Sequence, residues 1–319
     1  MSIGTNIKKK RFELGMSQQE LAIELGYRSK STIAKIENGE NGVSSKKLPL
    51  FATALHTTVE ELVSGVDKIN VIPADYSSDS TGPRNIAVIL AGGKSTRNMQ
   101  NIPNQFISVY GKPIIIYSME AYQHHPAINE IYVVCINGWE DILISYAHQF
   151  SITKLKGVIP SGETGILSVK NAIDYLSDKC NKEDTIIFQE STRPLVTEEN
   201  ISRLLLEYIK KGSAATCGSM HEHLQFSTKD GILKYIDRNF LIETQSPEAY
   251  KYEDLSNMFT KAEKRHHKYT ESCCSMFLFN LGMKPNFYEG NLSNIKIIRP
   301  EDIVLFSAYI KNATTDIIK

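Results

Sequence analysis

The sequence predicts two domains in tandem, a small all-α domain followed by a larger α/β domain with a mostly parallel sheet. Three observations predict this arrangement. The chain has 319 residues, which exceeds the usual size of a single domain. Apolar residues recur at helical spacing over residues 3–65, whereas strand candidates alternate with helical segments from residue 85 onward. A polar, turn-rich stretch separates the two patterns, so we assign residues 1–66 to the first domain, 67–84 to a linker and 85–319 to the second domain.

The composition is that of an ordinary soluble globular protein. Apolar residues make up 41% and charged residues 23%, and the formal net charge is zero, so any basic surface for nucleic acid must be local. The five cysteines lack the spacing of a zinc site, and we interpret them as reduced, mostly buried thiols of a cytoplasmic protein. No run approaches the roughly 20 apolar residues of a membrane span, so we expect no membrane partner. The histidines that we interpret as surface side chains are His124, His125, His266 and His267.

Short helices with clear end signals make up the first domain. Ser17 is followed three residues later by Glu20, the capping-box pattern, which predicts a helix over Gln18–Leu25. Gly26 ends this helix, and a second short helix follows. Two helices joined by such a turn are typical of a helix-turn-helix, in which the second helix enters the major groove of DNA.

This geometry divides the residues of the motif into a packing set and a DNA-facing set. We expect Ala22, Ile33 and Ile36 to hold the helices together. The residues that we expect to face bases and phosphates are Gln18, Ser29, Lys30, Ser31, Thr32 and Lys35. Over residues 4–65 the sequence resembles the phage-repressor-like (XRE-type) helix-turn-helix family, which implies sequence-specific binding of duplex DNA by a dimer. A helical interaction bundle with a solvated polar face is the alternative.

The second domain shows strands and helices in alternation. Strand candidates lie at residues 86–90, 131–135, 158–159, 186–188 and 214–217, and the clearest helical segments between them are 113–124, 166–176 and 198–210. Strands that alternate with helices imply βαβ units, which build a mostly parallel sheet covered on both faces.

The first strand of this domain runs into a glycine-rich loop. Ala91, Gly92 and Gly93 follow the strand, and Lys94 and Arg97 come next. Glycines after a strand let backbone N–H groups approach an anion, and the two cations add the charge that holds a triphosphate. The loop is neither a Walker A motif nor G-x-G-x-x-G, which disfavours kinases, ATPases and dehydrogenases.

Further motifs follow in a fixed order. They are Pro103-Asn104-Gln105-Phe106, Gly111-Lys112-Pro113, Ser168-Val169-Lys170, Arg193-Pro194-Leu195-Val196, Asp237-Arg238, Gln245-Ser246-Pro247 and Asn294-Ile295-Lys296. Over residues 86–311 this series resembles the cytidylyltransferases that activate methylerythritol phosphate or ribitol phosphate, nucleotidyltransferases with a Rossmann-like α/β fold. The resemblance implies CTP and a polyol phosphate as substrates, Mg²⁺ as cofactor, and a homodimer that pairs through an arm, here residues 218–240.

The resemblance also implies roles for individual residues. It assigns catalysis to Arg97, Lys296 and Asn104, nucleotide binding to Ala91, Gly92, Gly93, Lys94, Gly162 and Ser168, and acceptor binding to Glu190, Arg193, Arg238 and Thr270. Such residues suit in-line attack of a phosphate on the α-phosphorus of CTP, because this chemistry depends on positioning and on neutralisation of charge. No residue is implied as a ligand of the metal.

Several chemical positions depart from the family pattern. Asn104 stands where the family has a lysine, Gly165 where it has an arginine, and Glu190 and Glu271 where it has aspartates. We therefore expect weak activity that rises in Asn104→Lys, because a cation there would stabilise the departing pyrophosphate. One alternative is a transferase-like domain that no longer turns over and serves a transcriptional regulator as its ligand sensor. Another is an unrelated α/β binding module that keeps the motifs only as part of its scaffold.

Overall fold

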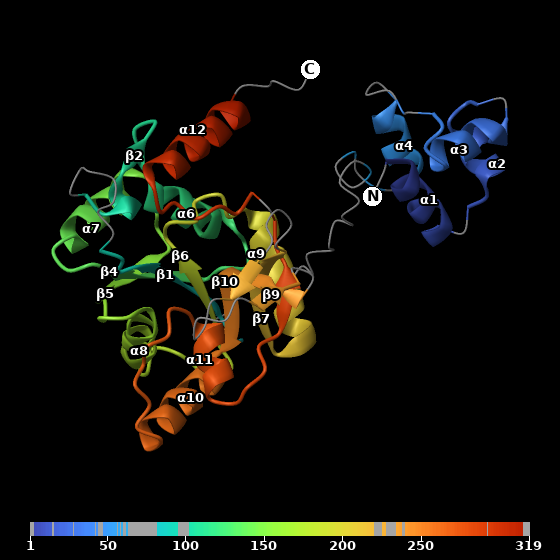
Figure 1. Cartoon of the computed structure of the whole chain (residues 1–319). Helices are drawn as coiled ribbons and strands as arrows, with labels where there is room; N and C mark the ends of the chain where they lie inside the picture. Colours follow the sequence, from blue (N-terminus) through green and yellow to red (C-terminus); the bar gives the residue numbers. More distant parts are fainter. Residues whose placement is uncertain are drawn as a thin grey trace. The chain divides into compact units, whose positions relative to one another are not determined.

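The chain divides into two compact units, Met1–Ser77 and Ser78–Lys319, which we describe separately (Figure 1). The computed structural model describes residues 3–14, 16–27, 29–41, 43, 47–55, 57, 59, 62, 82–94, 102–219, 225–227, 234–237, 240–291 and 293–314. Most of the predicted linker lies outside the described residues.

The described part of the first unit contains the helices α1 (Ile3–Glu13), α2 (Gln18–Glu24), α3 (Lys30–Glu37) and α4 (Leu48–Ala54). The predicted capping box is confirmed, since the Ser17 side chain accepts from the Glu20 backbone and the Glu20 side chain accepts from the Ser17 backbone. The core that these helices share includes Ala22, Ile33 and Ile36, as predicted.

Close contact and a buried ion pair join α1 to α3. A Cβ built on Gly4 would lie 3.0 Å from the carbonyl carbon of Ile36 and nearer still to its oxygen, so the two backbones touch. Arg11 and Glu37 are both buried, and Arg11 Nε lies 2.6 Å from Glu37 Oε1. Breaking such a pair would leave an uncompensated buried charge, so the pair helps to hold α1 against α3.

A seven-stranded sheet in the order β11-β7-β10-β6-β1-β4-β5 forms the centre of the second unit. Its strands are β1 (Asn85–Ala91), β4 (Glu130–Cys135), β5 (Leu155–Pro160), β6 (Thr185–Glu190), β7 (Ser213–Ser219), β10 (Ile242–Lys251) and β11 (Phe287–Glu289). Strand β10 runs antiparallel to both of its neighbours, and the other pairs are parallel. The prediction of a mostly parallel sheet is therefore confirmed, although β10 and β11 were not among the predicted strands.

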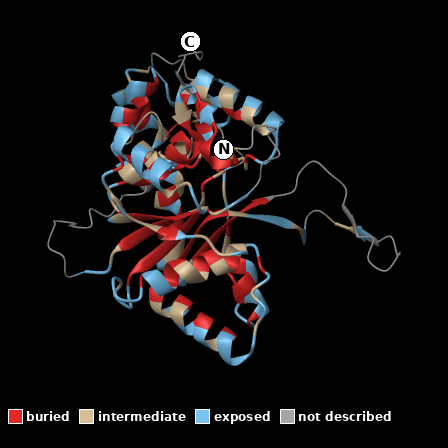
Figure 2. Cartoon of the chain, turned by 90° about the vertical axis from the view of Figure 1, so that its left-hand side faces the viewer, coloured by how far each residue is buried: buried red, intermediate tan, exposed pale blue. Residues whose placement is uncertain are grey.

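Helices cover both faces of this sheet (Figure 1). One face carries α6 (Ile114–His124), α7 (Glu140–Gln149) and α9 (Glu198–Lys211), and the other carries α8 (Gly165–Tyr175), α10 (Tyr252–Lys264) and α11 (Cys274–Asn280). The central strands are buried between the two layers, and the helices turn their exposed sides outward (Figure 2). A three-layer arrangement of this kind leaves the ends of the strands as the place for a site.

Smaller elements complete the second unit. They are the 3₁₀ helix η1 (Asn104–Phe106), the strands β2 (Ser108–Val109) and β3 (Lys112–Pro113), the helix α12 (Pro300–Thr314), and the strands β8 (Gln225–Ser227) and β9 (Lys234–Ile236). Helix α12 packs through Phe306 on a separate apolar cluster with Ile297 and Ile114. Strands β8 and β9 form an antiparallel pair within the expected arm, much of which lies outside the described residues.

The interpretation of the histidines as surface side chains is wrong for His125. This residue is buried, its Nε2 lies 2.9 Å from the hydroxyl of Ser202, and its Nδ1 accepts from the backbone N–H of Ala127 at 3.2 Å. Burial, together with the nearby charge of Lys154, lowers the pKa of His125 to about 4. His267 is half-buried and pairs with Glu271.

One other expectation from the sequence agrees with the structure. All five cysteines are free, and Cys135, Cys217 and Cys274 are buried. Within the described part of the chain, no helix is long and apolar enough to cross a membrane.

Candidate active site

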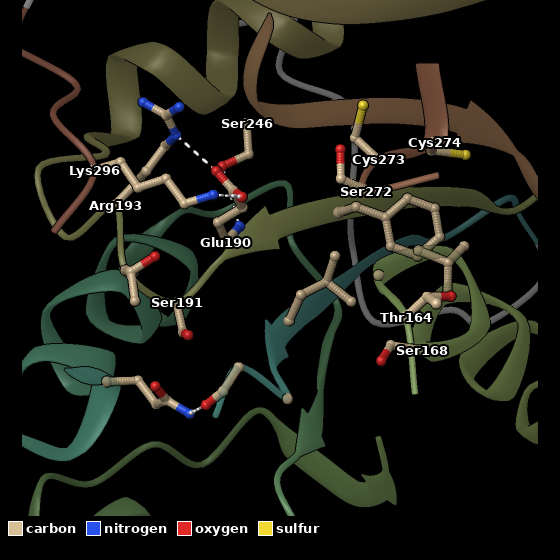
Figure 3. A pocket seen from close by; sticks show the side chains of 18 of the residues that line it. Thr164, Ser168, Glu190, Ser191, Arg193, Ser246, Ser272, Cys273, Cys274 and Lys296 are labelled. Atoms are coloured by element: carbon tan, nitrogen blue, oxygen red, sulfur yellow. Dashed lines mark hydrogen bonds and ion pairs between the residues drawn. The ribbon is translucent and has the colours of Figure 1, made fainter. Parts of the chain in front are cut away.

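A cavity of about 620 Å³ opens where β1, β5 and β6 end (Figure 3). Its walls come from the loop after β1, η1, the first turn of α8, the end of β6, β10, the turn before α11, and the segment 296–298. The carboxyl ends of parallel strands are the usual place for a ligand in a sheet of this type.

The glycine-rich loop forms one side of the cavity, and the side chain of Gln105 fixes its shape. Gln105 is buried, and its Nε2 donates to the carbonyl oxygen of Ala91 at 2.8 Å and to that of Gly93 at 3.0 Å. A Cβ built on Gly92 would lie 2.5 Å from the Cβ of Ser161, so only glycine fits here without movement. The described start of the loop, Ala91 to Gly93, is thus fixed in position beside the cavity.

The N-terminus of α8 forms a second side. The hydroxyl of Thr164 accepts from the backbone N–H of Leu167 at 3.2 Å and donates to the carbonyl oxygen of Tyr269 at 2.9 Å. The hydroxyl of Ser168 accepts from the backbone N–H of Gly162 at 3.0 Å. Gly162 and Ser168, which the resemblance assigns to the nucleotide, therefore lie together at a helix N-terminus, where polar and anionic groups are favoured.

The turn before α11 occupies the space where a side chain at position 165 would begin. A Cβ built on Gly165 would lie 2.9 Å from the carbonyl carbon of Ser272 and nearer still to its oxygen. The backbone N–H of Ile166 also donates to the carbonyl oxygen of Glu271 at 3.1 Å. An arginine at position 165 is incompatible with this turn, and the turn itself contributes Ser272 to the cavity wall.

Two cations share one carboxylate on the opposite side of the cavity (Figure 3). Arg193 Nε lies 2.8 Å from Glu190 Oε2, and Lys296 Nζ pairs with the other oxygen of Glu190. Burial opposes ionisation of Glu190, but the charges of Lys296 and Arg193 outweigh it and hold its pKa below the ordinary value. The cluster has an excess of one positive charge, which suits it to receive an anion.

Asn104 connects the segment that carries Lys296 to η1. It is buried, and its Nδ2 lies 3.1 Å from the carbonyl oxygen of Ile298 and 3.4 Å from that of Ile297. The amide therefore positions the neighbouring lysine. A lysine at position 104 that extended toward a phosphate would lose both of these hydrogen bonds to the 297–298 backbone.

Comparison with known proteins identifies both units. A family model described as 2-C-methyl-D-erythritol 4-phosphate cytidylyltransferase matches residues 85–312. The chain belongs to this cytidylyltransferase family. A helix-turn-helix model matches residues 7–62, so the first unit is a helix-turn-helix domain. Both resemblances inferred from the sequence are confirmed.

Individual relatives match the cytidylyltransferase unit over nearly their whole length. A ribitol-5-phosphate cytidylyltransferase from Lacticaseibacillus paracasei is 37% identical over 70% of this chain and 97% of its own. One from Vibrio parahaemolyticus is 33% identical over 71% and 95%. A 2-C-methyl-D-erythritol 4-phosphate cytidylyltransferase from Clostridium botulinum is 28% identical over 72% and 99%. The solved 4-diphosphocytidyl-2C-methyl-D-erythritol synthase of Anaerococcus prevotii shares the fold, with a TM-score of 0.60 at 20% identity over 72% of this chain and 96% of its own.

Most of the residues that the sequence assigned to the cytidylyltransferase site line the cavity. They are Gly92, Gly93, Lys94, Asn104, Gly162, Ser168, Glu190, Arg193 and Lys296. Ala91 is buried directly before the loop, and Thr270 is exposed and is not among the described residues that line the cavity. Arg97 and Arg238 lie outside the described residues.

Among the residues that β10 and the turn before α11 contribute to the wall, only Ser246 was singled out from the sequence, in the Gln245-Ser246-Pro247 motif. The residues of this part of the wall are Thr244, Ser246, Glu248, Ser272, Cys273 and Cys274. The Gln245-Ser246-Pro247 motif was a signal for the first half of this set, since a motif of the series lies next to Glu248.

In the helix-turn-helix domain, α3 presents the expected polar residues. The hydroxyl of Ser29 accepts from the backbone N–H of Ser31 at 3.2 Å and so caps the helix. Lys30 and Lys35 are exposed on the same helix. Gln18 is half-buried, and its amide donates to Glu37 at 2.8 Å, so this side chain also supports the packing of α2 on α3.

Proposed function

We propose that the second unit transfers a cytidylyl group from CTP to the phosphate of a sugar alcohol. An oxygen of the acceptor phosphate forms a bond to the α-phosphorus, the bond from that phosphorus to the bridging oxygen breaks, and pyrophosphate leaves with both electrons. The relatives that are 30% identical or more carry the name of ribitol 5-phosphate, which favours a pentitol phosphate as the acceptor. The observation that carries the proposal is the cavity, which is lined both by the start of the glycine-rich loop and by the cluster of Glu190, Arg193 and Lys296.

Each part of the cavity has a separate task in this proposal. The α8 end, with Gly162 and Ser168, receives the base and ribose, and the loop from Gly92 to Lys94 cradles the triphosphate. Lys296 neutralises charge on the phosphorus under attack. Arg193, which also donates to the carbonyl oxygen of Asn294 at 2.7 Å, is held rigidly for the acceptor phosphate. Such fixed charges lower a barrier because they need no reorganisation during the reaction.

Mg²⁺ in this proposal is carried by the oxygens of the triphosphate. The described residues contain no group of three or more side chains that suit a metal. The carboxylate of Glu190 is already paired with the side chains of Arg193 and Lys296. The carboxylate of Glu248 already accepts hydrogen bonds from Tyr250 and Ser275. Mg²⁺ usually binds through substrate phosphates with few protein ligands, and it would withdraw charge from the leaving pyrophosphate. Chelation with EDTA should abolish transfer, and added Mg²⁺ should restore it.

The test is pyrophosphate release from CTP and Mg²⁺ with ribitol 5-phosphate, methylerythritol 4-phosphate and glycerol 3-phosphate as acceptors. We expect turnover with one of the first two and little with ATP, GTP or UTP in place of CTP. CTP binding without turnover would point to a ligand sensor, an alternative that the family comparison does not favour. Absence of CTP binding would refute the proposal.

We further propose that the first unit binds duplex DNA through α3 and that the arm, residues 218–240, pairs two chains. Pairing would place two helix-turn-helix domains in one dimer and so raise the affinity for a two-fold symmetric DNA site. Selection from a random library should enrich one sequence, and the affinity should fall steeply with salt. Lys35→Ala should lower the salt slope by about one, whereas Lys156→Ala, an exposed lysine of the other unit, should leave it unchanged.

A further inference from the structure

A second carboxylate, which is buried, lies in the cavity wall apart from the cation cluster. Glu248 is on β10 and is only 4% exposed, and it lines the cavity together with Thr244 and Ser246 from the same strand. Its surroundings differ from those of Glu190. The bonds that Glu248 accepts come from the hydroxyl of Tyr250 at 2.9 Å and from the backbone N–H and hydroxyl of Ser275 at 3.0 and 2.9 Å. All of these donors are neutral.

Glu248 supplies the cap that α11 lacks in its own sequence. The N-cap residue of α11 is Cys273, whose side chain makes no capping bond, and Ser275 is the second residue of the helix. The first N–H groups of a helix need acceptors, and a carboxylate is a strong one. Glu248 therefore holds the turn that brings Cys273 and Cys274 to the cavity.

The side chain of Glu248 changes between its charged and neutral forms near neutral pH. Burial raises the pKa of Glu248 to about 7, against the opposing effect of the bonds from Tyr250 and Ser275, and the negative charge of Glu190 adds to the rise. The other titratable groups beside it are Tyr250 and the thiols of Cys273 and Cys274. Burial raises the pKa of all three, so they are uncharged at neutral pH. An anion in the cavity would favour the protonated form of Glu248 further.

We propose that Glu248 is a positioning residue of the transfer site that couples nucleotide binding to the uptake of a proton. The inference rests on the proposed function, since it needs a triphosphate in this cavity. The cap survives protonation, because the oxygen that accepts from the Ser275 backbone keeps its role while the new O–H donates to a hydroxyl, and hydroxyls serve as donor or acceptor. The negative charge disappears while the wall stays in place.

The proton can be counted by calorimetry of CTP binding to the full chain with Mg²⁺ at pH 7, in two buffers of different ionisation enthalpy. The wild type should take up about half a proton more than Glu248→Gln, since a group near its pKa is about half ionised. Glutamine has the same shape and accepts the same backbone bond, but it has no proton to gain. Glu199→Gln, the same change at an exposed residue that is not among the described residues lining the cavity, should keep the uptake of the wild type.

The pH dependence gives a second measurement. The affinity of the wild type for CTP should fall between pH 6.5 and 8 more steeply than that of Glu248→Gln, by about threefold or more, because each unit of pKa shift is tenfold in binding. Ser275→Ala removes a bond that lowers the pKa of Glu248, so its profile should move to higher pH, and this variant decides the matter if Glu248→Gln does not fold.

The outcomes separate this inference from the function on which it rests. CTP binding with equal proton uptake in the wild type and Glu248→Gln, or an unmoved profile in Ser275→Ala, would overturn the role of Glu248 and leave the proposed function intact. A wild type that binds no CTP would overturn both.

Discussion

Substitution of Gly165 by alanine tests whether the turn before α11 sets the geometry of the cavity. The new Cβ would lie 2.9 Å from the carbonyl carbon of Ser272, whereas ordinary contact begins at 3.4 Å. The turn must therefore move away by about 0.5 Å, and by more at the carbonyl oxygen of Ser272, which lies nearer still to the methyl group of the new alanine. The bonds from Ile166 and Thr164 to the same turn, at 3.1 and 2.9 Å, would lengthen toward breakage. Overpacking of this kind costs about 1–3 kcal/mol.

The same movement should be visible in catalysis. A displacement near 1 Å at a site that works by positioning can lower the rate by about 100-fold, so we expect kcat/KM for CTP to fall by about 10- to 100-fold in Gly165→Ala. Initial rates of pyrophosphate release measure this, with Gly82→Ala as control, because a Cβ there has no neighbour within 4 Å. Wild-type kinetics in Gly165→Ala would show that the turn yields freely and that the reasoning is wrong.

Three further substitutions probe other parts of the chain. Lys296→Met should lower kcat by about 100-fold or more with a smaller effect on KM for CTP, in initial-rate measurements, because the lysine acts where charge develops; an unchanged kcat would contradict its role. Gly4→Ala should abolish DNA binding in gel shifts and leave transfer intact, because its methyl group would overlap the backbone of Ile36. His125→Asn should destabilise the protein at pH 7 and less at pH 4.5, by urea unfolding. Since burial depresses the pKa of His125 to about 4, the stability that it gives is present above about pH 6.5 and is lost as the pH falls through 4; an equal loss at both pH values would refute this.

Local signals made much of the fold predictable. The capping box of α2 and the apolar strands β1, β4 and β6 follow from residues next to one another in the chain, and each was found. Strand β10 was missed because Ile242–Lys251 contains several polar residues and a proline, so it lacks the apolar run of a buried strand. Only the pairing with β6 and β7 makes this segment a central strand.

Part of the candidate site could also be predicted from the sequence, and part could not. The glycine-rich loop and Lys296 belong to motifs whose order was recognisable. The contributions of Glu248 and Ser272 depend on which side chains the tertiary structure brings to α11 and α8, and no spacing in the sequence encodes that. His125 was wrongly predicted to be exposed, because polar neighbours in the sequence do not show whether another element packs over the end of a helix. Here α9 does so, and its Ser202 contacts His125.

Strand β10 has a consequence for how this protein can change. Its ten residues begin beside the expected arm, where Ile242 pairs with Ser219, and continue past the cavity to Lys251. A single insertion within it would reverse the side chains of every residue beyond that point unless a bulge absorbed it, and the pairing with β7 already has an irregular register between Thr244 and Glu248. The expected arm and the wall of the cavity therefore share one strand, so a change of length between them has to be taken up at this irregularity.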